Sequence, residues 1–199
     1  MLKRLRTVVR LAPLYIIIAV LLSIPIWQNQ QRARRVAETA AQAHQLLESS
    51  ESSPKPSTPI DVSGEPIRII LPNQFIDLPI VEGNYDPVAK TWPVNPRTAN
   101  YATNTPIINN KTGVTVVYGH ATNAIFGKTA SLKPGDTVLV YTANNHVFEY
   151  SYTGDVTVNP TDLSVFSNLD GAPTLKLLTC SGAFSQNRRI MSFSLTRVV

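Results

Sequence analysis

From residue 60 onward the chain is a succession of short β-rich segments, and this pattern restricts the fold more than any other feature. Eight segments rich in Val, Ile, Thr, Tyr and Phe are separated by Gly, Pro, Asn and Asp, and TANNH has the composition of a hairpin turn. The segments are PIRIILP, FIDLPIV, GVTVVYG, DTVLVYT, HVFEYSYTG, DVTVNP, TLKLLT and RIMSFSLTRV. Residues 60–199 are therefore predicted to form one all-β domain, either a barrel or a sandwich.

The net charge of +5 does not indicate a nucleic-acid-binding surface, because it is confined to the N-terminal segment. Residues 1–60 contain eight basic and three acidic side chains, whereas residues 61–199 contain ten of each. Basic residues beside an apolar run are typical of a membrane topology signal. We therefore expect a membrane, and no nucleic acid, among the partners of the chain.

The apolar run is LAPLYIIIAVLLSIPIW, residues 11–27, and it contains no charged residue. With Val8 and Val9 it approaches the roughly 20 residues that cross a hydrocarbon core. An uncleaved anchor is favoured over a cleaved signal peptide, because the run is long for a signal sequence and no small-x-small site follows it. A buried helix is the third alternative. The basic residues of the segment 1–10 favour a cytoplasmic N-terminus and an extracytoplasmic remainder.

The segment between the apolar run and the β-rich domain has two parts. QQRARRVAETAAQAHQLLE contains no Gly or Pro and predicts a helical stalk. SSESSPKPSTP predicts a flexible Ser/Pro linker. The predicted organisation is a basic cytoplasmic tail (1–10), a transmembrane anchor (11–27), stalk and linker (28–59) and a catalytic domain (60–199).

The single cysteine, Cys180, follows the strand-like segment TLKLLT. One cysteine cannot form an intramolecular disulfide, so in an extracytoplasmic chain it is either deeply buried or functional. His120 follows the segment GVTVVYG, and Arg188 and Arg189 begin the last segment. A histidine can act as proton partner of a thiolate, and a guanidinium can stabilise charge on a reacting carbonyl oxygen.

Each of these residues also has an ordinary structural interpretation. Cys180 could be a buried and inert thiol, and His120 could be a hydrogen-bonded loop histidine. The two arginines could be the solvated start of a strand. His146 enters VFEY from a turn and is expected to face solvent. Composition alone therefore allows a Cys-His-Arg site without establishing it.

Three segments, in order, make the chain resemble the sortases, the membrane-anchored cysteine transpeptidases of bacterial surfaces. KLLTC is similar to the family's Thr-Leu-x-Thr-Cys motif and ends in Cys180, with Lys176 in place of the first Thr. VVYGHATNAIFG contains the family's Gly-His pair at His120 and is followed by LKPGDTVLVYT, and VNPTDLSVF resembles the segment before the nucleophile strand. The similarity extends over about residues 67–198.

The resemblance implies a sortase-like eight-stranded β-barrel with short helices and loops, preceded by a transmembrane helix. It implies that Cys180 is the nucleophile and His120 the proton donor and acceptor. An arginine at the start of the last strand is implied to stabilise the oxyanion. Arg189 is preferred because it directly precedes IMSFSL, and Arg188 is the alternative, since adjacent strand residues point to opposite faces. Thr179 is expected to help bind substrate.

The implied reaction cleaves an LPxTG-like sorting signal through a thioester and transfers the protein to an amine. The acceptor would be a peptidoglycan precursor, as in cell-wall anchoring, or a pilin lysine, as in pilus assembly. We favour the former, because no regulatory lid is evident between the linker and the first strand. This chemistry needs no metal or other cofactor, and the calcium that some sortases bind has no dense acidic cluster here. The implied location is the bacterial cell membrane, as a single-pass protein.

Two rival interpretations remain. Cysteine transpeptidases that act on peptidoglycan place their histidine and cysteine close together in sequence, whereas His120 and Cys180 lie far apart here. A non-catalytic, membrane-tethered β-domain that binds peptide would require Cys180 to be buried and unreactive. The accessibility of Cys180 in the fold separates this second rival from an enzyme.

Overall fold

The structure, a computed structural model, describes residues 28, 30–46, 48, 61–86, 88, 91–166 and 169–199. The cytoplasmic tail and the transmembrane anchor expected from the sequence lie outside the described residues, as does the expected Ser/Pro linker. Within the described ranges, no helix is long and apolar enough to cross a membrane.

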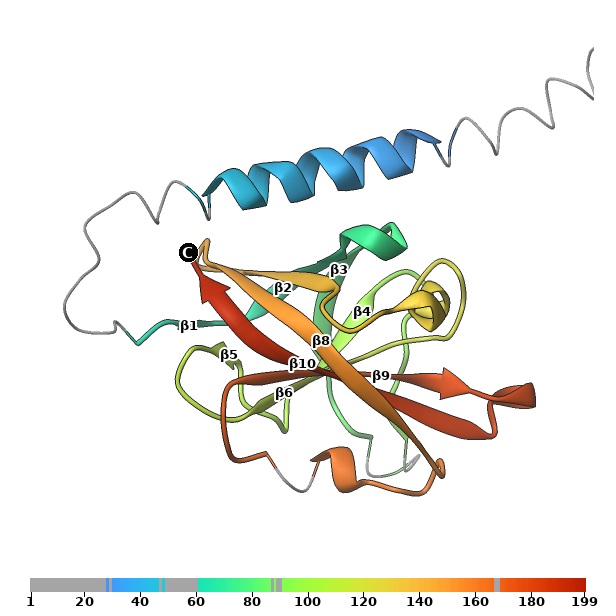
Figure 1. The fold of residues 1–199 in the computed structure, drawn as a ribbon. Helices are drawn as coiled ribbons and strands as arrows, with labels where there is room; N and C mark the ends of the chain where they lie inside the picture. The colour runs from blue at the N-terminus through green and yellow to red at the C-terminus, as the bar shows by residue number, and fades with distance from the viewer. Residues whose placement is uncertain are drawn as a thin grey trace, which may run out of the picture.

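Eight strands close into a barrel in the order β10-β8-β7-β2-β3-β4-β6-β9 (Figure 1). Neighbouring strands are antiparallel except in the pairs β3–β4 and β6–β9, which are parallel. The barrel strands are β2 (Pro66–Leu71), β3 (Ile76–Gly83), β4 (Ala99–Ala102), β6 (Val114–Tyr118), β7 (Thr137–Thr142), β8 (Val147–Val158), β9 (Thr174–Ser181) and β10 (Asn187–Val198). The prediction of an all-β barrel is confirmed.

Smaller elements connect the barrel strands. Strands β1 (Ser63–Gly64) and β5 (Ile108–Asn109) form a separate two-stranded sheet. Within the residues that the structure describes, four short 3-10 helices occur in loops: η1 (Pro72–Gln74), η2 (Gly127–Ser131), η3 (Ser164–Phe166) and η4 (Ala183–Ser185). The loop between β6 and β7 contains η2, the loop between β8 and β9 contains η3, and the loop between β9 and β10 contains η4.

The barrel is filled by the alternate residues of its strands, as the period of a β-strand requires. In β9, Leu175, Leu177 and Thr179 are buried, whereas the residues between them are partly exposed. Phe148 and Phe193 join Leu175 and Leu177 in the same core cluster. The intervening residues of β9 therefore face the outside of the barrel.

Two predicted strands proved to be one, and one strand of the barrel was not predicted. HVFEYSYTG and DVTVNP are both part of β8, which continues through Gly154. Gly154 has a φ of 150°, and the pairing of β8 with β10 shifts register beside it, between Ser192 and Phe193. A β-bulge thus replaces the expected turn. The short strand β4, ANYA, has no alternating pattern because all four of its residues are buried.

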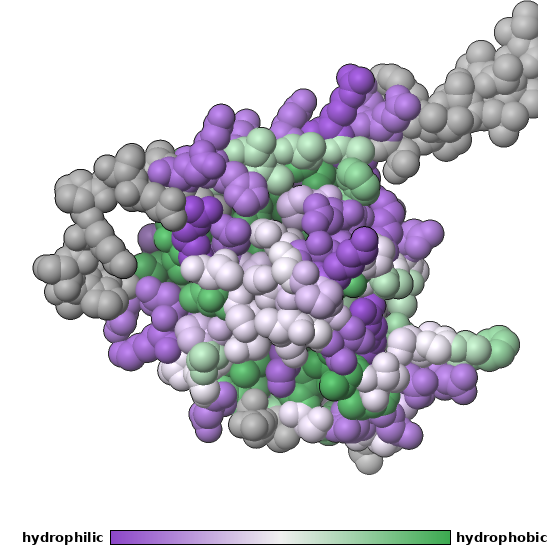
Figure 2. Space-filling model, in the orientation of Figure 1, coloured by the Kyte–Doolittle hydropathy of each residue, from purple (hydrophilic) through white to green (hydrophobic). Residues whose placement is uncertain are grey.

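The helix expected after the apolar run is present over residues 30–46, but it does not stand apart as a stalk. Its residues Val36, Ala40 and Ala43 are buried against Ile70 of β2 and Leu139 of β7 in one apolar cluster. The spacing of the three helix residues puts them on one face. In Figure 2 hydrophobic surface lies below the helix, where it meets the barrel, and hydrophilic side chains project from its outer side.

Candidate active site

Cys180 is near the end of β9 and on the outer side of the barrel wall. Thr179, the residue before it, is buried. Because side chains alternate along a strand, Cys180 is on the same partly exposed side as Leu178. The thiol is free and half-buried. It is therefore not sealed in the core, which is the position that an inert cysteine usually occupies.

The parallel pairing of β6 and β9 brings the segment of His120 to the strand that carries Cys180. The register pairs Tyr118 with Leu178, and Gly119 N donates a hydrogen bond of 3.1 Å to Leu178 O. His120 directly follows Gly119, so it leaves β6 next to the part of β9 that carries Cys180.

Thr179 strengthens the junction between β6 and β9. Its side chain is buried, and its hydroxyl donates a hydrogen bond of 2.9 Å to Gly119 O. Gly119 immediately precedes His120, so this bond ties the backbone of the histidine segment to the backbone of the cysteine segment. Thr179 also lines the cleft described below.

The two arginines of β10 point to opposite sides of the barrel wall. Arg188 is paired with Cys180 across the antiparallel β9–β10 ladder, and Arg189 is paired with Thr179. Directly paired residues have their side chains on the same face of a sheet. Arg188 therefore shares the outer face with Cys180, and its Nη1 donates to Ser185 O and Asn187 O at 3.0 and 3.1 Å.

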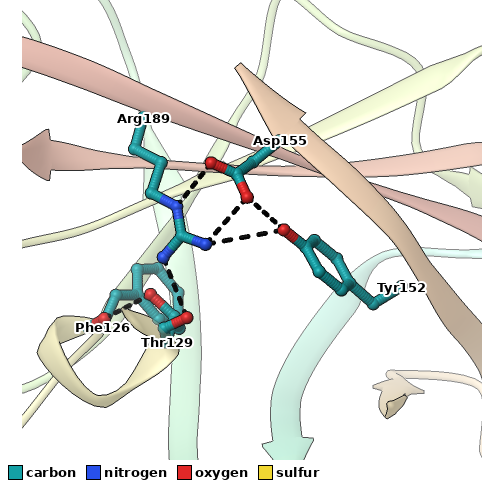
Figure 3. Close-up of polar contacts among 5 residues, drawn as sticks. All are labelled: Phe126, Thr129, Tyr152, Asp155 and Arg189. Atoms are coloured by element: carbon teal, nitrogen blue, oxygen red, sulfur yellow. Dashed lines mark hydrogen bonds and ion pairs between the residues drawn. The ribbon is translucent and has the colours of Figure 1, made fainter. Parts of the chain in front are cut away.

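The Arg189 side chain points toward Asp155, Tyr152 and the 3-10 helix that contains Thr129 (Figure 3). Its Nε and Nη2 each donate to the Asp155 carboxylate at 2.8 Å, and its Nη1 donates to Thr129 O at 2.9 Å. The Arg189 guanidinium holds the pKa of Asp155 at about 2, below its ordinary 3.8. The arginine paired with Cys180 is therefore Arg188, and Arg189, which the sequence favoured, is paired with Thr179. The reason is strand parity, which sequence alone left open.

A cleft of about 500 Å³ lies over the outer face and includes Cys180 and Arg188 in its wall. Its apolar part is built around Trp92, from the loop between β3 and β4. The Trp92 ring stacks on Phe166 of η3, with centroids 5.0 Å apart, and meets Tyr118 edge-on at 5.5 Å. The other lining residues are Tyr85, Thr91, Val94, Gly119, Pro160, Thr161, Asp162, Leu163, Leu178 and Thr179.

The aromatic wall of the cleft was not anticipated. Burial raises the pKa of Tyr118 to about 12, and its phenol donates a hydrogen bond of 3.1 Å to Pro93 O. Trp92 lies in a turn-rich segment, TWP, with no strand pattern, so nothing local indicated where its ring would pack. The cleft therefore combines an aromatic wall with the Cys180 thiol and the Arg188 guanidinium.

The described part of the chain contains no group of three or more His, Cys, Asp or Glu side chains that could hold a metal ion.

The comparisons with known proteins agree on one family. The model of the Sortase domain matches residues 69–195. Sortase E1 from Streptomyces coelicolor, solved with a tripeptide in its active site, is 24% identical, with a TM-score of 0.55 over 68% of this chain and 90% of that one. The SrtA sortase from Actinomyces oris is 20% identical, with a TM-score of 0.56 over 74% and 88%.

A third solved structure, Listeria monocytogenes sortase A, is 21% identical, with a TM-score of 0.54 over 67% of this chain and 88% of that one. At these identities the structures support the fold alone. No curated protein gives a significant match to the chain.

Proposed function

Because the chain belongs to the sortase family, we propose that it is a cysteine transpeptidase that cleaves an LPxTG-like sorting signal and transfers the protein to an amine. One observation carries this proposal. Cys180 and Arg188 are cross-strand partners in the wall of one cleft, and His120 follows the strand that pairs with β9 on its other side. The pairing of β6, β9 and β10 supports the proposal, because it puts three segments that are distant in the sequence next to one another.

The first half-reaction transfers an acyl group to sulfur. The thiolate of Cys180 attacks the carbonyl carbon between Thr and Gly of the sorting signal, a C–S bond forms and the carbonyl electrons move to oxygen. When the carbonyl forms again, the C–N bond breaks. The departing amine takes a proton from the His120 imidazolium. The client protein is left attached to Cys180 as a thioester.

The second half-reaction reverses these roles with a different amine. The incoming amine gives a proton to the neutral His120 imidazole, and its nitrogen attacks the thioester carbon. A new C–N bond forms, the C–S bond breaks and the Cys180 thiolate is restored. No oxidant, metal or nucleotide is consumed in either half.

We assign the oxyanion-stabilising role to Arg188. Its guanidinium is on the face and in the cleft of Cys180, and its hydrogen bonds to described residues use only Nη1. Nε and Nη2 carry further donors that a tetrahedral oxyanion could accept. Such donors stabilise the transition state more than the ground state, because charge develops on the oxygen only there.

The client would lie along the apolar wall around Trp92, with its leucine and proline against aromatic rings. For the acceptor we favour a peptidoglycan precursor, which makes this a cell-wall-anchoring enzyme at the membrane. A pilin lysine is the alternative. The non-catalytic binder is disfavoured because Cys180 is half-buried in a cleft and not enclosed in the core.

A transpeptidation assay tests the proposal. The full chain in detergent is incubated with LPxTG-like peptides and with either triglycine or a lysine-containing peptide as acceptor. We expect a covalent adduct on Cys180 by mass spectrometry and no turnover by Cys180→Ala. His120→Ala should lower kcat by about 10²- to 10⁴-fold, and Arg188→Ala by about 10²- to 10³-fold.

Arg188→Lys is the informative conservative variant, because an ammonium keeps the charge but lacks the planar fork of donors. We expect it to recover only a small part of the lost rate. Full turnover by Cys180→Ala would overturn the mechanism. An inactive Arg189→Lys beside a fully active Arg188→Ala would overturn the choice of arginine.

A further inference from the structure

The loop that carries His120 is held by a chain of hydrogen bonds that leads away from the cleft. Phe126 N donates to His120 O at 3.0 Å, which closes the first part of the loop. The Thr129 hydroxyl and the Thr129 N then donate to Phe126 O at 2.6 and 3.0 Å. Ile125 and Phe126 are fully buried in the barrel core, so the middle of this loop is anchored to the core.

The last link of the chain is Arg189. Its Nη1 donates to Thr129 O at 2.9 Å, and its other nitrogens are fixed by Asp155 of β8 (Figure 3). The Tyr152 hydroxyl donates to the same carboxylate. The side chains of Arg189 and Asp155 are only 17% and 28% exposed. A charged pair this well covered, with two hydrogen bonds, holds a defined geometry.

We propose that Arg189 and Asp155 are positioning residues. They hold the loop that begins at His120 in a fixed position relative to β9, the strand that carries Cys180. The inference rests on the proposed function. Consecutive residues of β10 then do two jobs: Arg188 faces the cysteine, and Arg189 fixes the loop of the histidine. Strand β10 becomes the common frame for all three groups of the site, because β9 is paired with it and the loop is bonded to it.

A matched control exists on the same two strands. Arg197 of β10 donates to the Glu149 carboxylate of β8 at 3.1 and 3.3 Å, and their side chains are 25% and 15% exposed. This pair joins the same strands with similar cover, at the far end of β10. If the Arg189–Asp155 pair served only to bind β8 to β10, loss of either pair would have the same consequences.

The experiment compares Arg189→Lys, Asp155→Asn and Arg197→Gln with wild type, as full chains in detergent. Lysine keeps the cation, but a single ammonium cannot bridge both carboxylate oxygens and Thr129 O. In the transpeptidation assay we expect Arg189→Lys and Asp155→Asn to lower kcat by about 10- to 100-fold with KM within about twofold, the cost of a misplaced catalytic group. Arg197→Gln should stay within about twofold of wild type for both constants.

Two substrate-free measurements separate this inference from the proposed function. Amide hydrogen exchange in residues 120–131 should accelerate by about tenfold or more in Arg189→Lys and Asp155→Asn, and should not change in Arg197→Gln. The pH profile of Cys180 alkylation by iodoacetamide should move from the wild-type profile toward that of His120→Ala. If wild type turns over no peptide, the proposed function fails, and hydrogen exchange still decides the positioning role.

The inference is overturned if Arg189→Lys and Asp155→Asn keep wild-type exchange in residues 120–131. It is also overturned if Arg197→Gln loses kcat to the same extent, since the effect would then be one of general stability. Identical alkylation profiles for wild type and His120→Ala would instead contradict the pairing of His120 with Cys180.

Discussion

Arg188 and Arg189 are consecutive in the chain, and their guanidinium groups lie on different sides of the barrel wall. The first lines the cleft of Cys180, and the second donates hydrogen bonds to Asp155 and Thr129. The alternation of a β-strand produces this division at no structural cost. A one-residue slip in the β9–β10 register would exchange the two roles, so the site depends on the register as much as on the residues.

The Asp155 carboxylate should make the stability of the fold depend on pH in the acidic range. Its pKa is about 2 in the fold, against an ordinary 3.8, first because of the hydrogen bonds from Arg189. A carboxyl whose pKa is lowered by folding stabilises the fold above its unfolded pKa, and this stabilisation is lost as the pH falls through the folded pKa. Asp155→Asn should therefore lower the free energy of unfolding by about 1–2 kcal/mol at pH 7. The difference in this free energy between the variant and wild type should narrow between about pH 4 and pH 2.

Urea unfolding midpoints of wild type and Asp155→Asn, measured at pH 7, 4 and 3, test this dependence. Arg197→Gln, measured in parallel, shows what the loss of an ion pair between the same strands does at each pH. A gap between wild type and Asp155→Asn that is as large at pH 3 as at pH 7 would show that the carboxylate charge is not the source of the stability.

The sequence predicted the individual residues of the site unevenly, for physical reasons. Cys180 and His120 stand in local motifs at strand ends, so short segments were sufficient to propose them. The choice of arginine needed the strand register, which is set by pairing and by the position of bulges. Trp92, Phe166 and the Arg189–Asp155 pair come from loops or from strands far apart in sequence, and only the closed barrel brings them together.

At the scale of elements, the helix over residues 30–46 is part of the folded domain. Val36, Ala40 and Ala43 are buried, whereas the neighbouring Ala41 is exposed. The Tyr141 hydroxyl also reaches Thr39 O at 3.5 Å. The helix itself was predictable from composition, because Ala, Gln, Glu and Arg favour helices. Its docking was not, because three apolar residues in a helix of this length are a weak signal.

Ala43→Asp should release the helix from the barrel, while Ala41→Asp should not. Ala43 is fully buried, so Ala43→Asp would bury an unpaired charge. The helix can avoid this cost by separating from the barrel. We expect trypsin to cleave Ala43→Asp after the exposed Arg34 and Arg35 about tenfold faster than wild type or Ala41→Asp, since proteolysis follows local opening. Equal cleavage rates for the two aspartate variants would contradict docking through this face.

The strands also show where local pattern is insufficient. The sequence predicted eight strands and the barrel has eight, but the sets differ: β8 was divided in two, and β4 was missed. Gly154 appears as a turn residue in the sequence, yet β10 pairs with β8 on both sides of it and the strand continues. Strand β4 is buried throughout and only four residues long, so it carries no alternation to detect.

On the scale of the whole molecule, the helix and the cleft occupy opposite sides of the barrel. The helix packs on β2 and β7, and the cleft lies over β6, β9 and β10. In the closed order of eight strands, the pair β7–β2 is diametrically opposed to the pair β6–β9 (Figure 1). The wall that packs against the helix is therefore opposite the wall that carries Cys180 and Arg188, and a hydrogen bond of 3.5 Å, from Arg32 Nη2 to Ala124 O, joins the helix to the loop after His120.

A chain that begins at residue 60 should consequently be less stable but still active. Without the helix, Ile70, Leu139 and Val147 would lose their cover. We expect a loss of about 2–4 kcal/mol in the free energy of unfolding, seen as a lower urea midpoint, with kcat/KM per folded molecule within about threefold of the full chain. A large loss of kcat/KM at unchanged stability would show that the helix acts on the cleft.

Because the helix packs on the wall opposite Cys180, the thiol is on the side of the barrel that the helix does not cover. The helix covers the back of the barrel and leaves the front, which carries the cleft, uncovered. If the proposed function holds, a bulky client and the acceptor amine can approach Cys180 from this uncovered side without displacing the helix.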